Sequence, residues 1–253
     1  KSKGYYSACV GKWHLGFDWP WKGGVKPPTS VIGSGTSKAT CDLFDWSEPI
    51  QGGPLGAGFD YYFGALGAND NGMVRFHENN EAAGSTKDMG ELTTLYTNKS
   101  IAWLKEKRDP EKPFVLYLAH TMMHTIIDAS DRFRGKSAGG LYGDVVEELD
   151  HRVGEIFEAL KKEKLDRKTI VVFLSDGVPD VDGGGGRGNS FDQIEESVTA
   201  LQELAETFRV GDFAFHTAYI ATGRESSDSA SRELLQRMAD AGGGNFRDFP
   251  NGE

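Results

Sequence analysis

The chain has 253 residues, of which 38% are hydrophobic and 11% aromatic, a composition typical of globular rather than disordered proteins. Its formal net charge of −10 argues against nucleic-acid binding, which needs a basic face. No apolar run approaches the roughly 18 residues of a membrane-spanning helix, so the sequence predicts no span.

The first predicted element is a strand over residues 5–10, followed by the hexapeptide Gly-Lys-Trp-His-Leu-Gly at 11–16. Alternation along an extended backbone would place Lys12 and His14 on the same side. A cation beside a side chain that exchanges protons is suited to an anionic substrate. By itself, a Lys-x-His pair is more often a surface lysine and a structural histidine.

The middle of the chain combines an irregular region with regular elements. Residues 17–90 are rich in Gly, Pro, Asp, Asn and aromatic residues, which is typical of a binding surface or of poor order, although the aromatic run 59–64 predicts that part of the region packs. A helix is expected over 91–107, a buried strand over 113–119 and an amphipathic helix over 140–164.

The last part of the chain alternates between strand and helix patterns. The expected elements are a buried strand 169–174 that ends at Ser175-Asp176-Gly177, a glycine loop 183–186, a helix around 194–208, a strand 213–221, a helix around 234–239 and a strand 245–249. This alternation predicts an α/β fold whose mostly parallel sheet is flanked by helices. Ligands of such folds bind at the carboxyl ends of strands.

Three further candidate residues follow predicted strands. His120 and His124 come directly after the strand 113–119 and could hold a metal ion if helical, or be ordinary turn histidines. Asp176 ends a strand, where it could bind a metal or a phosphate-like group, or cap the next turn.

Residues 1 to about 176 resemble sulfatases of the alkaline-phosphatase superfamily, and most of all bacterial arylsulfatases. Six stretches carry the resemblance in family order: 11–16, 58–64, 112–125, 135–137, 140–150 and 169–176. The resemblance implies hydrolysis of sulfuric esters by a formylglycine hydrate with the help of Ca²⁺. It matches Lys12 and His14 with the pair that contacts formylglycine, His124 with the histidine that contacts the sulfate or leaving group, and Asp176 with a Ca²⁺ ligand.

The chain departs from the family pattern around the nucleophile. Neither Cys9 nor Cys41 lies in a Cys/Ser-x-Pro-Ser-Arg motif, and the paired aspartates that precede this motif are absent. Gly177 stands where the family usually has Asn. We therefore expect a sulfatase by descent that shows no appreciable turnover as this chain. The resemblance implies a sulfate-ester small molecule or carbohydrate as substrate, and a periplasmic or secreted location.

Residues from about 169 to 253 resemble a different family, the von Willebrand factor type A domain, in the stretches 173–180, 208–211, 216–220 and 235–244. All sixteen lysines lie in residues 1–168, which also suggests parts of different origin. The predicted domains are therefore a partial sulfatase-like domain 1–176 and a von Willebrand A-like segment 177–253 that continues the same sheet. Two alternatives to the sulfatase function stay open: a metal-dependent protein-binding module, with Asp176 as a metal ligand, and a truncated fusion without a function of its own.

Overall fold

The structure, a computed structural model, describes residues 3–26, 42–69, 72–172, 217–220, 232–233, 235–240 and 243–249. The chain divides into two compact units, Lys1–Ile170 and Val171–Glu253. In the described residues, the first unit contains a five-stranded sheet and the second a pair of strands.

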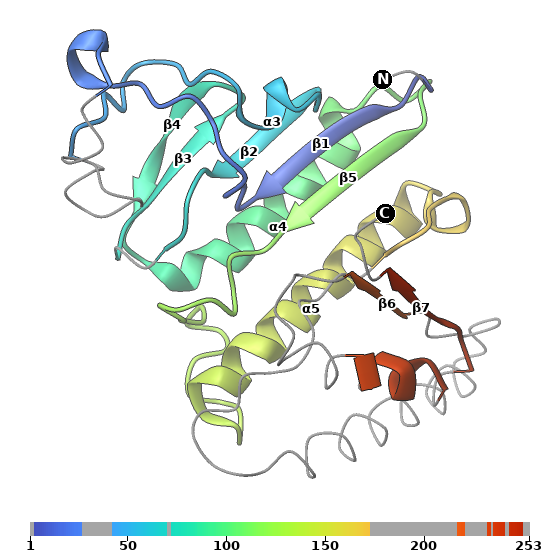
Figure 1. Ribbon diagram of the computed structural model, residues 1–253. Coiled ribbons are helices and arrows are strands. Elements are labelled where there is room, and N and C mark those ends of the chain that lie inside the picture. The colour runs from blue at the N-terminus through green and yellow to red at the C-terminus, as the bar shows by residue number, and fades with distance from the viewer. Residues whose placement is uncertain are drawn as a thin grey trace. The chain divides into compact units, whose positions relative to one another are not determined.

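The five strands of the first unit form a mixed sheet in the order β4-β3-β2-β1-β5 (Figure 1). Their bounds are Tyr6–Gly11 for β1, Tyr61–Ala65 for β2, Val74–Glu78 for β3, Glu81–Thr86 for β4 and Phe114–Ala119 for β5. Strand β1 pairs in parallel with β2 and β5, whereas β3 is antiparallel to β2 and β4. The expected α/β fold is therefore confirmed, with a parallel centre and an antiparallel extension that the sequence pattern of 17–90 did not reveal.

Two long helices support this sheet. Helix α4 (Leu92–Ala102) continues as the π-helical turn η3 (Trp103–Lys107) and lies against β1, β2 and β5, and helix α5 (Gly140–Lys162) packs beside it (Figure 1). Both helices occupy the ranges expected from their apolar periodicity. The core that they share with the sheet includes the buried residues Ala8, Val10, Phe63, Leu92, Tyr96, Trp103, Val145 and Ile156.

The other face of the sheet is covered by part of the region 17–90. Buried Cys9, Ile50, Tyr62 and Leu66 form a second core, against which Trp13, Phe17, Leu55 and Phe59 pack. This layer contains the short helix α3 (Gly53–Gly56), and the 3-10 turn η1 (Lys22–Gly24) lies in the same region of the sequence without buried residues. The ring of Trp19 lies 4.0 Å from those of both Phe17 and Phe44. The expectation that aromatic residues pack part of this region is confirmed.

Two apolar runs, one in β5 and one in α5, are more exposed than the sequence suggested. In β5, Val115 and Tyr117 are exposed, since this strand is the last of the sheet in the described residues. In α5, Val146 and Phe157 are also exposed, because the face of the helix toward the sheet is the one that carries Val145 and Ile156.

The expected buried strand 169–174 is wrong over its described part. The 3-10 turn η4 (Asp166–Lys168) precedes it, and residues 169–172 form no strand. Ile170 and Val172 are 90% and 71% exposed. A β-branched run forms a strand only where a neighbouring strand supplies hydrogen bonds, and within the described segments residues 169–172 pair with no strand.

The second unit contains the parallel strands β6 (Thr217–Ile220) and β7 (Phe246–Phe249), which lie inside the ranges expected to be strands. Residues 235–240 are helical, as expected around 234–239. Asp176, the glycine loop 183–186 and the expected helix 194–208 lie outside the described residues. No helix in the described segments has the length and apolarity needed to cross a membrane.

Candidate active site at the carboxyl edge of the sheet

The segment that follows β1 is held between its two parallel neighbours by main-chain hydrogen bonds. The Lys12 N–H donates to the Ala119 carbonyl at the end of β5, at 2.8 Å. The Trp13 N–H donates to the Ala65 carbonyl at the end of β2, also at 2.8 Å, and the His14 N–H donates to the Leu66 carbonyl at 3.0 Å. Lys12 and His14 therefore lie at the carboxyl edge of the sheet, as expected for a ligand site.

Glycines allow the strands to approach each other closely at this edge. A Cβ at Gly11, whose φ is +111°, would lie 1.9 Å from the Ala119 carbonyl oxygen. A Cβ at Gly64 in β2 would lie 1.8 Å from the Gly11 carbonyl oxygen. Any side chain at either position would push the three strand ends apart, so the two glycines determine the spacing of the edge.

The side chains of Lys12 and His14 differ in environment. Lys12 is half-buried and His14 is exposed. The backbone is not extended through residue 14, because His14 has a φ of +48° in the left-handed region. Strand alternation therefore does not place the two side chains on one side, although both residues lie at the same edge.

His120 follows β5 directly and is half-buried. Its ring lies 6.4 Å from that of buried Tyr96 in α4. Both ring nitrogens are buried and lack hydrogen-bond partners in the part of the chain that the structure describes. Burial lowers the pKa of His120 to about 4, so the imidazole is neutral near pH 7. This environment is that of a half-buried, uncharged histidine. A metal ion held jointly by His120 and His124 stays a prediction.

His124 lies in the next turn, with an exposed side chain. Its main-chain N–H donates to the Thr121 carbonyl at 3.0 Å. Its Nδ1 lies 2.6 Å from the Thr125 carbonyl oxygen, and because a carbonyl can only accept, Nδ1 carries the proton. Nε2 is then the nitrogen that can exchange a proton with a ligand.

A residue that sequence reasoning missed holds this turn. Asn69, in the loop after β2, is fully buried, and its side-chain amide donates to the carbonyls of His124 and Ile126 at 3.2 and 2.8 Å. These contacts join residues 55 and 57 positions apart in the chain. No local pattern distinguishes such an asparagine from one that merely forms a turn.

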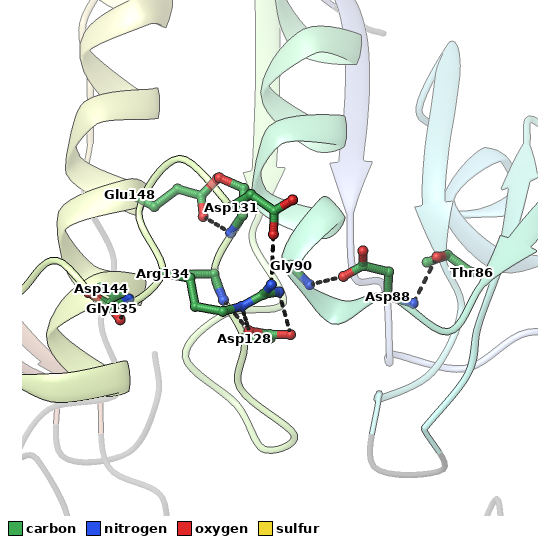
Figure 2. Close-up of polar contacts among 11 residues, drawn as sticks. Thr86, Asp88, Gly90, Asp128, Asp131, Arg134, Gly135, Asp144 and Glu148 are labelled. Carbon is green, nitrogen blue, oxygen red and sulfur yellow. Dashed lines mark hydrogen bonds and ion pairs between the residues drawn. The ribbon is translucent and has the colours of Figure 1, made fainter.

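The chain after this turn is held by carboxylates of α5 (Figure 2). Asp144 accepts hydrogen bonds from the N–H groups of residues 135–137 at 2.7 to 2.9 Å, and these bonds lower its pKa. Glu148 accepts from the Ser130 N–H at 2.7 Å and from the Thr94 hydroxyl at 3.0 Å. On the exposed side, Arg134 pairs with Asp128 and Asp131.

The described residues do not fit the metal or the nucleophile that the resemblance implies. They include no group of three or more His, Cys, Asp or Glu side chains that could hold a metal ion. Asp176 and Cys41 lie outside them. Cys9 is buried within β1, and burial raises the pKa of its thiol to about 12, so it offers no thiolate.

Comparison with known proteins identifies the family. A family model described as Sulfatase matches residues 1–203. The chain belongs to the sulfatase family. The matched range extends beyond residue 176, where the sequence suggested a junction, and none of the comparisons supports a von Willebrand A segment.

Curated relatives include sulfatases from animals and bacteria. N-acetylgalactosamine-6-sulfatase of Mus musculus is 31% identical over 193 residues, which cover 70% of this chain and 31% of that protein. N-acetylgalactosamine-6-O-sulfatase of Bacteroides thetaiotaomicron is 27% identical over 224 residues, or 73% of this chain and 42% of that protein. The chain thus spans less than half the length of these relatives.

A solved structure from work on glycosaminoglycan metabolism by Bacteroides thetaiotaomicron shares the fold. It superposes with a TM-score of 0.55 and 24% sequence identity, covering 72% of this chain and 45% of that one. The mixed α/β architecture is therefore that of solved sulfatases.

Proposed function

We propose that the carboxyl edge of this sheet is the anion-recognising side of a sulfuric-ester hydrolase site, with Lys12, His14 and His124 as the residues that contact the ester. The observation that carries the proposal is the clamping of residues 12–14 between the ends of β2 and β5. In a member of the sulfatase family, this arrangement fixes the Lys-Trp-His segment where a substrate would bind.

Each side chain has a chemical role that follows from its environment. The half-buried Lys12 ammonium offsets the negative charge of a sulfate group and the charge that grows on its oxygens during cleavage. His14, exposed at the same edge, offers a second donor to the anion. His124, with Nδ1 engaged by Thr125, can protonate the leaving oxygen through Nε2.

The second part of the proposal is that this chain by itself has no appreciable sulfatase turnover. Its 253 residues contain no Cys/Ser-x-Pro-Ser-Arg motif from which formylglycine could form. Asp176 would supply one Ca²⁺ ligand, whereas Ca²⁺ takes six to eight oxygen ligands. The edge would therefore bind a sulfate ester, but the chain would lack the nucleophile that attacks the sulfur.

For the substrate we propose a sulfated carbohydrate, with an aryl sulfate as the alternative. Two of the relatives are named for N-acetylgalactosamine 6-sulfate, and sulfate esters of either kind present the same anion. We further propose that the protein acts in the periplasm or outside the cell, as the family resemblance implies.

The test is a titration of the purified chain with N-acetylgalactosamine 6-sulfate and with 4-nitrocatechol sulfate, followed by calorimetry and by release of the aryl alcohol. We expect binding that weakens about tenfold or more in Lys12→Ala and in His14→Ala, as for the loss of a charge-assisted hydrogen bond. Lys161→Ala, which removes a lysine from the end of α5, is the matched control and should bind as the original chain does. Release of the aryl alcohol above background, abolished by His14→Ala, would refute the absence of turnover.

The alternative, a von Willebrand A-type protein-binding module that depends on a metal ion, rests on the C-terminal unit. Its support is the compact unit Val171–Glu253 with the parallel strands β6 and β7. Divalent-metal binding that is lost in Asp176→Ala and unaffected by Lys12→Ala would favour it. A fusion without a function of its own, the remaining alternative, would give neither ester nor metal binding and would unfold with poor cooperativity.

A further inference from the structure

We infer that Asn69 is a positioning residue for His124, because it holds the turn that determines which imidazole nitrogen faces the ligand. The inference rests on the proposed function in one respect, namely that His124 contacts the ester.

The contacts of Asn69 leave a single orientation for its side chain. Its Nδ2 lies 3.2 Å from the His124 carbonyl oxygen and 2.8 Å from the Ile126 carbonyl oxygen. Both partners can only accept, so the amide nitrogen must face them and the amide cannot be flipped. The side chain is fully buried, and Oδ1 has no hydrogen-bond partner in the described segments. Asn69 is therefore engaged through its two amide hydrogens.

These two bonds bracket the carbonyl that fixes the imidazole. The Thr125 carbonyl, which accepts the Nδ1 proton at 2.6 Å, lies between the carbonyls of His124 and Ile126 that Asn69 holds. If the turn is released, the Thr125 carbonyl can rotate away, and the preference for a proton on Nδ1 is lost. The amide of Asn69 thereby acts on the ring without touching it.

Asn69 also connects the strand ends around β1. It follows β2, and its carbonyl accepts from the Gly72 N–H at 3.0 Å, which anchors its own loop. The turn that it holds follows β5. Hydrogen bonds from segments that follow β2 and β5 thus hold both His124 and residues 12–14 in place.

The experiment measures the imidazole tautomer of His124 by ¹⁵N NMR of the full chain labelled at histidine, with His124→Gln used to assign the signal. Asn69→Leu keeps the branching at Cγ and removes both donors. Asn69→Asp keeps the shape and also removes them. We expect the ratio of Nδ1–H to Nε2–H tautomer at His124 to fall about fivefold in each, the population change that one lost hydrogen bond of about 1 kcal/mol produces.

The control is Asn80→Asp, which makes the same exchange at another asparagine with a buried Oδ1, in the β3–β4 turn. It should leave the His124 signal unchanged. An unchanged tautomer ratio in a folded Asn69 variant, or an equal change in Asn80→Asp, would overturn the inference. If both Asn69→Leu and Asn69→Asp fail to fold, Asn69→Ala, which also lacks a side-chain donor, takes their place with the same two outcomes.

The same samples separate this inference from the proposed function. Titration of the original chain with 4-nitrocatechol sulfate tests whether the edge binds an ester. Absence of binding together with a tautomer shift in the Asn69 variants would end the proposed function and keep the role of Asn69 in fixing His124.

Discussion

Two consecutive stretches of chain follow β5, and different chemistry holds each of them. The first, residues 120–126, carries His124 and is held by neutral groups, namely the amide of Asn69 and main-chain bonds. The second, residues 128–137, is held by the carboxylates Asp144 and Glu148 of α5. An anion would be repelled by carboxylates beside its site, so neutral anchors suit a stretch that we propose to face a sulfate ester.

The largest expected effect comes from removing an acidic anchor. Glu148→Ala should lower the free energy of unfolding by about 3 kcal/mol, since it removes hydrogen bonds to a buried charge and leaves the Ser130 N–H without its acceptor. Glu147→Ala, one residue earlier on the exposed side of α5, is the matched control and should change stability little. Urea unfolding measures both. Equal losses in the two variants would show that the second stretch does not depend on its carboxylates.

A pH-dependent effect of intermediate size is expected from the first stretch. His120 has a pKa of about 4 in the folded chain because it is buried, against 6.5 when unfolded, so below pH 6.5 the unfolded chain binds the proton more readily. The contribution of His120 to the free energy of unfolding is fully present above pH 6.5 and is lost as the pH falls toward 4. Between about pH 7 and pH 5 the free energy of unfolding should fall by roughly 2 kcal/mol for this reason.

His120→Phe, which keeps an aromatic ring beside Tyr96, should remove that part of the pH dependence in urea unfolding. His77 in β3, whose pKa burial also lowers to about 4, supplies the comparison, since His77→Phe should remove a separate and similar share. If His120→Phe retains the whole pH dependence of the original chain, the neutral character of the first stretch is not what stabilises it.

The smallest effect is expected from the exposed side of the second stretch. Arg134→Ala should reduce stability only slightly, because its ion pairs with Asp128 and Asp131 are open to solvent. The difference from the original chain should shrink at high salt, which screens exposed pairs. Thermal unfolding at low and at high salt measures it. A loss that salt does not reduce would place Arg134 with Glu148 among the buried anchors.

The sequence predicted those parts of the fold whose signal is local. The helices α4 and α5 and the strands β1 and β5 carry their apolar periodicity in a single window, and all four lie where it indicated. Strands β3 and β4 were missed because β4 is exposed over nearly its whole length and β3 is irregularly paired, so neither gives a clear alternation. The stretch 169–172 shows the opposite case, in which strand-forming residues lack a partner.

The candidate site was predictable only as far as its residues follow strand ends. Lys12, His14, His120 and His124 could be assigned to one edge of the sheet from the order of the elements, and they lie there. The contact of His120 with Tyr96 could not be foreseen, because Tyr96 lies in a helix that precedes β5. The role of Asn69 depends on contacts across more than fifty residues, which no local pattern reports. Asp176 stays a prediction.

The main-chain clamp at the end of β1 also affects how this protein could be re-engineered. The bonds that hold residues 12–14 come from N–H groups, which every amino acid except proline possesses. At position 12 the backbone is thus largely independent of the side chain, whereas at position 14 the φ of +48° disfavours β-branched residues. A library that varies positions 12 and 14 while keeping Gly11 and Gly64 should therefore sample new anion specificities on an unchanged scaffold.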